Sequence, residues 1–145
     1  MDENKDWMIL QDVSETEYTV CPDDKLDELK GQQLSLGIIT VLEFKEGIDA
    51  VKLNIGFRVI AGEKSGVISY GVSFVVELNG WAEMSHNEAD IRVNPLVKKM
   101  IKFCYPFLGG ALMKKTEGTK LAKLYLPVVD AEELMKRMII EKSDN

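Results

Sequence analysis

Two runs of alternating apolar and polar residues lie between residues 50 and 81 and predict a long β-hairpin. Every second position is apolar in both runs: Val51, Leu53, Ile55, Phe57 and Val59, then Tyr70, Val72, Phe74, Val76 and Leu78. Successive side chains of a strand point to opposite faces of a sheet, so each run has one face to bury. The connection between the runs carries Gly62 and Gly66, as a hairpin turn requires. Burial of this face, at ~1.5–3 kcal/mol for each large side chain, should drive folding.

Two further strands are predicted before the hairpin. Residues 7–20 form a strand that is more polar than the others, which favours an edge or bulged strand. Residues 25–33 form a polar connection that contains Leu26 and Leu29. Residues 34–45 form a strand with one apolar face, made by Leu34, Leu36, Ile38, Leu42 and Phe44. We therefore expect four strands in one antiparallel sheet.

The apolar spacing becomes helical after Trp81. Asn94 and Pro95 favour a helix start, and Pro106 should kink or split the helix that follows. Its apolar positions are Val97, Met100, Ile101, Cys104, Leu108, Ala111 and Leu112. A last helix is predicted over residues 130–140, because Asp130 and Glu133 have the spacing of a capping box. Strands followed by helices indicate one α+β domain over residues 1–145 with its helices on one sheet face, and with residues 1–5 and 141–145 frayed.

Composition narrows the class of protein. The chain has 145 residues, 46% of them hydrophobic and 29% charged, which is typical of one globular domain. The net charge of −6 argues against nonspecific binding to nucleic acid, and no apolar run approaches the ~20 residues of a membrane span. The acidic residues 1–6 do not resemble a secretory signal. Cys21 and Cys104 are far apart in the sequence, which favours free thiols in a reducing compartment, and hence a cytoplasmic protein.

Charge is distributed unevenly along the chain. Residues 1–30 carry ten acidic and three basic side chains, whereas residues 91–125 carry eight basic and one acidic side chain. Both regions could be solvated faces, or the acidic region could meet the basic helix of another copy.

The sequence offers little catalytic chemistry. His86 is the only histidine, and Cys104 lies on an apolar helical stripe where an inert core thiol is expected. Residues 62–66 have the letters of a phosphate-binding loop, but they join two antiparallel strands. Glu83, Glu88 and Asp90 have no specific spacing. We predict no enzyme, metal or cofactor, while a small-ligand-binding or enzymatic α+β domain with a pocket between sheet and helices stays open as the alternative.

Apolar side chains exceed what one small sheet is expected to bury. On the wetter sheet face we place Ile39, Val41, Ile60, Val75 and Trp81. Residues 121–129 form an extended link that adds Leu124, Tyr125, Leu126 and Val128. Either these side chains pack inside the monomer, or they form an oligomer interface or an apolar groove for extended polypeptide.

The order of elements and the C-terminal block resemble a known family. The block comprises an aromatic–proline helix start at residues 103–106, an apolar helix at 107–115, a glycine turn at 117–119, a leucine-rich link containing Pro127, and the last helix. Residues 8–17, MILQDVSETE, are also similar to the family's first strand. The chain thus resembles SecB, a tetrameric export chaperone that holds preproteins unfolded before translocation. On this resemblance Pro106 begins the main helix and residues 94–105 form a separate one.

The resemblance implies a noncatalytic chaperone whose partners are unfolded polypeptides and the translocase motor SecA, assembled as a homodimer or homotetramer. The implied groove would be lined by Leu26, Leu29, Leu124, Leu126, Leu134, Met135 and Met138. The oligomer interface would include Lys98, Lys102, Val75 and Trp81. The family's metal-binding C-terminal tail is missing and the outer sheet face is of mixed charge. A chaperone attached to a toxin–antitoxin pair is therefore implied as well as a general export factor.

Overall fold

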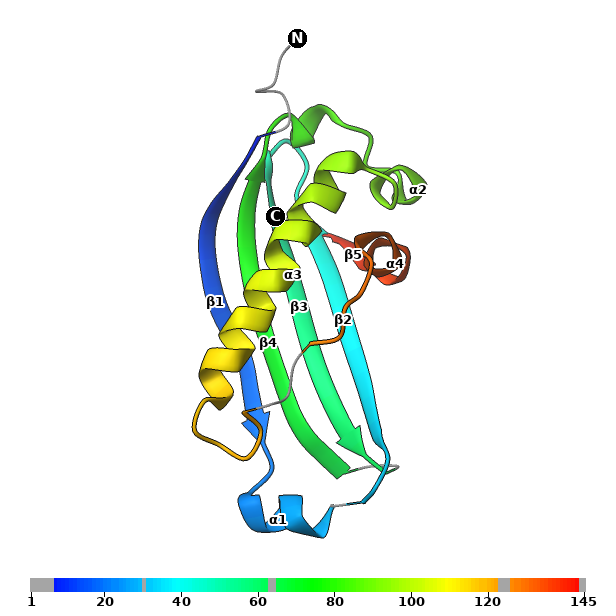
Figure 1. The fold of residues 1–145 in the computed structure, drawn as a ribbon. Coiled ribbons are helices and arrows are strands. Elements are labelled where there is room, and N and C mark those ends of the chain that lie inside the picture. The colour runs from blue at the N-terminus through cyan, green and yellow to red at the C-terminus, as the bar shows by residue number, and fades with distance from the viewer. Residues whose placement is uncertain (1–6, 30, 63–64, 123–125, 144–145) are drawn as a thin grey trace.

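The chain folds into a five-stranded sheet with a layer of helices on one face (Figure 1). The computed structural model describes residues 7–29, 31–62, 65–122 and 126–143. The strands are β1 (Met8–Val20), β2 (Leu34–Phe44), β3 (Ala50–Ala61), β4 (Ser65–Leu78) and β5 (Ile139–Lys142). The helices are α1 (Asp23–Glu28), a 3₁₀ turn (Trp81–Glu83), α2 (Glu88–Ile91), α3 (Pro95–Thr116) and α4 (Ala131–Arg137). The strand order across the sheet is β1-β4-β3-β2-β5.

The α+β class is confirmed, but the prediction of four antiparallel strands is wrong. The four long strands pair antiparallel as expected, and β5 adds a fifth strand parallel to β2. The last helix ends at Arg137, three residues earlier than predicted, and residues 139–142 are paired. Met138 is extended, and the two β-branched residues after it suit a strand better than a helix. The edge of β2 provides hydrogen-bonding partners for residues 139–142, which a helix at these positions would not use.

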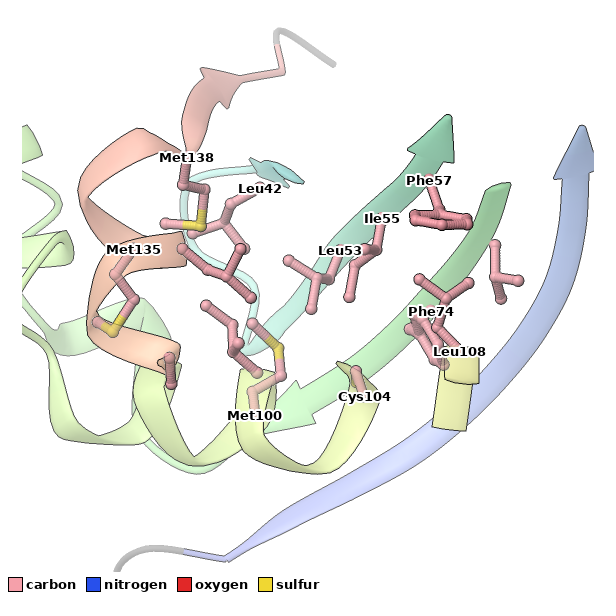
Figure 2. Close-up of a cluster of buried hydrophobic side chains, with 14 of the residues drawn as sticks. Leu42, Leu53, Ile55, Phe57, Phe74, Met100, Cys104, Leu108, Met135 and Met138 are labelled. Atoms are coloured by element: carbon pink, nitrogen blue, oxygen red, sulfur yellow. The ribbon is translucent and has the colours of Figure 1, made fainter. Parts of the chain in front are cut away.

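The central hairpin has the predicted buried face. All ten alternating apolar side chains of β3 and β4 are buried in the core. Helix α3 lies across this face, and Figure 2 shows Met100, Cys104 and Leu108 pointing toward the sheet. β1 is an edge strand with register shifts between Leu10 and Asp12 and between Glu15 and Glu17, which confirms the prediction for the polar first strand.

Helix α3 is continuous through Pro106, so the predicted split, and the separate helix at residues 94–105 implied by the resemblance, are wrong. Pro106 lies on the exposed side of the helix, as does Lys102, whose carbonyl lacks a donor from Pro106. Water can solvate that carbonyl, so the helix need not break there. The predicted start is confirmed, because Asn94 Oδ1 accepts hydrogen bonds from the backbone N–H groups of Leu96 (2.8 Å) and Val97 (3.3 Å).

Trp81 does not lie on the wetter sheet face, and that prediction is wrong. Its side chain is fully buried and stacks on His86, with ring centroids 4.6 Å apart. The strand period ends before residue 81 because the chain turns at Gly80, which has a φ of 76°. The rings of Phe44, Trp81 and His86 pack against one another, and His86 Nε2 donates a hydrogen bond to the Trp81 carbonyl.

Candidate functional site

An open groove lies between α3 and the segment that crosses it before α4. We call residues 126–129 the link. The groove has a volume of about 570 Å³. It is lined by Tyr105, Pro106, Gly109, Gly110, Met113, Leu126, Pro127, Val128 and Val129. None of these described lining side chains carries a charge, so the groove presents an apolar surface.

The link is held against α3 by one hydrogen bond and one close contact. The Tyr105 hydroxyl donates a 2.6 Å hydrogen bond to the carbonyl oxygen of Pro127, and burial raises the pKa of Tyr105. Leu126 packs over Gly109, where an added Cβ would lie 3.4 Å from Leu126 Cδ1, an ordinary van der Waals distance. A Cβ at Gly110 would meet nothing within 4 Å. The link thus packs over the first glycine of the pair, and the second leaves the groove open.

Apolar side chains on both sides of the groove are exposed. Met113 is 50% exposed on α3, and Val128 is fully exposed on the link. Phe103 and Phe107 are exposed on another side of α3, because the six residues from Phe107 to Met113 separate those two side chains by about 120° around the helix; we call Phe103 and Phe107 the α3 stripe. Phe107 also packs edge-on against Phe74, with ring centroids 5.5 Å apart. Helix α3 thus has a buried apolar side against the sheet and a second apolar side in contact with solvent.

Among the predicted groove residues that the structure describes, one lies in this groove. Leu126 lines it, while Leu124 lies outside the described residues. Leu134, Met135 and Met138 belong to the core, where α4 packs near β2 (Figure 2). Leu29 is buried in that core and Leu26 packs against it, so the structure does not bring either to the groove. The apolar stripe of α4 therefore faces the sheet and not the groove.

The predicted interface residues are in different environments. Val75 is half-buried on the sheet face away from the helices, and Lys102 is exposed. Lys98 forms a 2.6 Å ion pair with Glu132, whose hydrogen bond and charge raise the pKa of Lys98. Trp81 has no exposed surface to offer a partner, so we remove it from the candidate interface. The oligomeric state stays a prediction.

The acidic and basic regions of the sequence meet within one chain. Lys115 on α3 pairs with Glu15 on β1 at 3.2 Å, and Lys120 pairs with Asp27 on α1 at 3.2 Å. The ammonium of Lys115 also lies 4.8 Å from the centre of the Tyr18 ring. The acidic and basic regions therefore form ion pairs within one chain, and a second copy is not required to bring them together.

The candidate catalytic groups do not converge. Glu88 pairs with Arg92, and Asp90 accepts a hydrogen bond from the Ser85 hydroxyl. Burial raises the pKa of the Cys104 thiol to about 12, so it stays protonated at neutral pH. In the described part of the chain no group of three His, Cys, Asp or Glu side chains could hold a metal ion. No helix of that part is long and apolar enough to cross a membrane.

Solved structures with a similar fold exist. The Mycobacterium tuberculosis SecB-like chaperone Rv1957, solved in complex with a ChAD peptide from the Rv1956 HigA1 antitoxin, matches with a TM-score of 0.55. The match covers 84% of this chain and 90% of that one, at 12% identity. The fold is SecB-like. A protein of unknown function from Streptococcus agalactiae matches with a TM-score of 0.44 and 9% identity, over 86% of this chain and 98% of that one. No protein-family model and no curated protein matches.

The SecB-like fold was indicated by sequence, but most of the groove was not. Gly110, Met113 and Val128 line it without a motif of their own. The available signal was the double glycine inside an apolar helix, together with an extended leucine–proline segment that has no strand to pair with. That combination indicates a segment packed across a helix, which is the geometry found here.

Proposed function

We propose that this protein is a noncatalytic chaperone that binds unfolded polypeptides in the groove between α3 and the link. The observation that carries the proposal is an open groove whose described lining is uncharged, with exposed Met113 and Val128 on opposite walls. Monomeric proteins seldom expose contiguous apolar surface without a binding role. Met113 is flexible and polarizable, so it can adapt to different apolar side chains.

The groove suits an extended client better than a folded one. Its walls are a helix and an extended segment, and its lining offers shape and apolar contact without fixed charges. An unfolded chain can lay successive apolar side chains into such a groove, whereas a folded protein has already buried them. We therefore expect binding that is broad in sequence and weak at each contact.

The SecB-like fold supports polypeptide clients, and the solved complex of the mycobacterial chaperone has a peptide from an antitoxin. We accordingly propose two classes of client: exported preproteins, with SecA as a further partner, or an antitoxin. We also propose that the protein acts in the cytoplasm as a homodimer or homotetramer. The α3 stripe is the surface on which a second copy would be packed, because apolar helix faces of this kind are covered in stable oligomers.

A light-scattering assay tests the proposal. The wild-type protein should suppress aggregation of a chemically unfolded client, and Gly110→Trp should lose this effect because the indole fills the groove. Gly110→Ala is the matched control, since it adds one methyl group where nothing lies within 4 Å. Alanine should also raise helix stability by roughly 1 kcal/mol. Full suppression by Gly110→Trp, or none by the wild type, would contradict the proposal.

A further inference from the structure

The edge of the sheet formed by β2 is only partly covered. β5 pairs with residues 41–44 of β2, and its register begins at Val41 opposite Ile139. Within the described part of the chain, no strand pairs with residues 34–40 on this side. Figure 1 shows α4 and β5 beside one end of β2, with the rest of that strand at the margin of the sheet.

The backbone groups along the uncovered run alternate in direction. The N–H of Gly62 donates a 2.8 Å hydrogen bond to the carbonyl of Gln33, so Gln33 faces β3. In an antiparallel ladder the residues that face the partner alternate with residues that face away. The N–H and C=O groups of Leu34, Leu36 and Ile38 therefore point to the open edge. The same parity holds at the covered end, where the carbonyl of Phe44 accepts a 2.7 Å hydrogen bond from the N–H of Ser143.

The side chains along this run are apolar and accessible. Leu34 is 52% and Leu36 is 51% exposed, and both lie on the helix-bearing face because they pair with buried Ala61 and Val59. Ile39 is exposed on the other face. An added strand would find both hydrogen-bonding groups and apolar neighbours along residues 34–40.

The two long edge strands, β1 and β2, differ in charge and in the regularity of their pairing. β1 has two register shifts and exposes Asp12, Glu15 and Glu17, features that discourage pairing with another strand. The uncovered run of β2 has neither feature, since residues 34–40 contain no charged side chain and the β2–β3 register is unbroken. One edge of the sheet is thus protected and the other is suited to strand addition.

We propose that the β2 edge at residues 34–40 binds one extended, uncharged segment of the client polypeptide by strand addition, in line with β5. This inference rests on the proposed chaperone function and names how the client backbone is recognised. The uncharged run requires a segment without charged side chains, since a charge placed against it would lose water without gaining a partner. β5 shows that this edge accepts a strand.

A client fits this edge better than a second copy does. Two copies could pair their β2 edges antiparallel about a two-fold axis. The β5 strand of one copy would then block one end of the paired residues 34–40, and the β5 strand of the other copy would block the other end. A client strand meets β5 at one end only and can continue past residue 34. The client is therefore the occupant that the geometry favours.

The test compares Leu36→Pro with Leu36→Ala, using reduced, carboxymethylated α-lactalbumin as an unfolded probe and fluorescence anisotropy as the readout. Both variants lose the leucine side chain, and only proline removes the outward N–H without touching the β2–β3 ladder. We expect Leu36→Pro to bind the probe about fivefold more weakly than Leu36→Ala. Equal affinity of the two variants, with binding still lost in Gly110→Trp, overturns the edge site and leaves the groove intact. No binding by the wild type overturns both.

Hydrogen exchange on the wild-type protein provides a second test that does not depend on variant folding. The outward amides of Leu36 and Ile38 should exchange rapidly alone and slowly with saturating probe. The amides of Gly37 and Ile39 should be slow in both states, because they face β3. Unchanged exchange at Leu36 and Ile38 overturns the proposal. The proposal is also overturned if, without probe, the Leu36 and Ile38 amides become protected as protein concentration rises and sedimentation shows a doubled mass. A second copy would then cover the edge.

Discussion

The Tyr105 hydroxyl, on α3, lies 2.6 Å from the carbonyl oxygen of Pro127 on the link and donates a hydrogen bond to it. The two residues are 22 positions apart in the sequence, and their bond joins the two walls of the groove. Because Leu126 also packs over Gly109 of the same helix, the link contacts α3 at two adjacent points while Val128 remains exposed. The two walls of the groove, α3 and the link, are therefore bonded to each other within the fold.

Removal of this bond should loosen the groove. Tyr105→Phe keeps the ring and deletes the hydroxyl, so the Pro127 carbonyl loses its donor. We expect the free energy of unfolding to fall by about 1 kcal/mol, the usual net contribution of such a bond, and client affinity to fall with it. Urea denaturation and anisotropy on the same variant check both. Unchanged stability and affinity would show that the link is held by its apolar contacts alone.

Arg92 should anchor α4 and β5. Its Nη1 donates hydrogen bonds to the carbonyls of Met135 (2.9 Å), Lys136 (3.1 Å) and Met138 (2.7 Å), at the end of α4. We expect Arg92→Ala to cost about 2 kcal/mol in urea denaturation, because hydrogen bonds from a charged donor are lost. Hydrogen exchange should show β5 amides losing protection first.

Arg137→Ala is the matched control for Arg92. The Arg137 side chain is exposed and its ion pair with Glu133 spans 4.0 Å, so its removal should change stability by less than ~0.5 kcal/mol. Equal losses from the two variants would contradict the anchoring role of Arg92.

Alkaline pH should destabilise the fold through Cys104. Burial raises its pKa in the folded protein to about 12, from an ordinary value of 9.0. Between these values the unfolded chain loses the thiol proton while the folded chain keeps it. The unfolded state then binds fewer protons, so the free energy of unfolding falls as pH rises, by up to ~1.4 kcal/mol per pH unit.

Cys104→Ala isolates this contribution. We expect the variant to be less stable at neutral pH, because of the small cavity, but to lose less stability than the wild type between about pH 8 and about pH 10. Guanidinium denaturation at the two pH values gives the comparison. Equal losses in both proteins would mean that Cys104 ionises normally in the folded state.

The sheet could be predicted from sequence because its signals are local. The alternation in β3 and β4 and the polar character of β1 identify the core face and the edge strand. β5 could not be predicted in this way. Residues 139–142 follow a helical stripe without a break; Ile139 and Ile140 suit a strand, but the strand pairs with the edge of β2, and Arg92 holds the carbonyl just before it, two contacts that the local sequence does not reveal.

The groove depends on contacts between distant residues, which limits its prediction from sequence. Leu134, Met135 and Met138 have the same helical spacing whether α4 faces the sheet or a channel, and packing against the core decides for the sheet. Helix α3 carries apolar residues on two sides, and the spacing alone does not say which side is exposed. The neighbouring elements settle this, because the sheet covers Cys104 and Leu108 and leaves Phe103 and Met113 in solvent.

The central claim is that unfolded polypeptide binds between α3 and the link. Methionine-methyl NMR tests it most directly, because Met113 lines the groove while Met100, Met135 and Met138 are buried in the core. On titration with reduced, carboxymethylated α-lactalbumin, we predict that the Met113 methyl signal, assigned with Met113→Leu, shifts and saturates while the three core signals stay in place. A Met113 signal that does not move at any probe concentration, or core signals that move in its stead, would contradict the account.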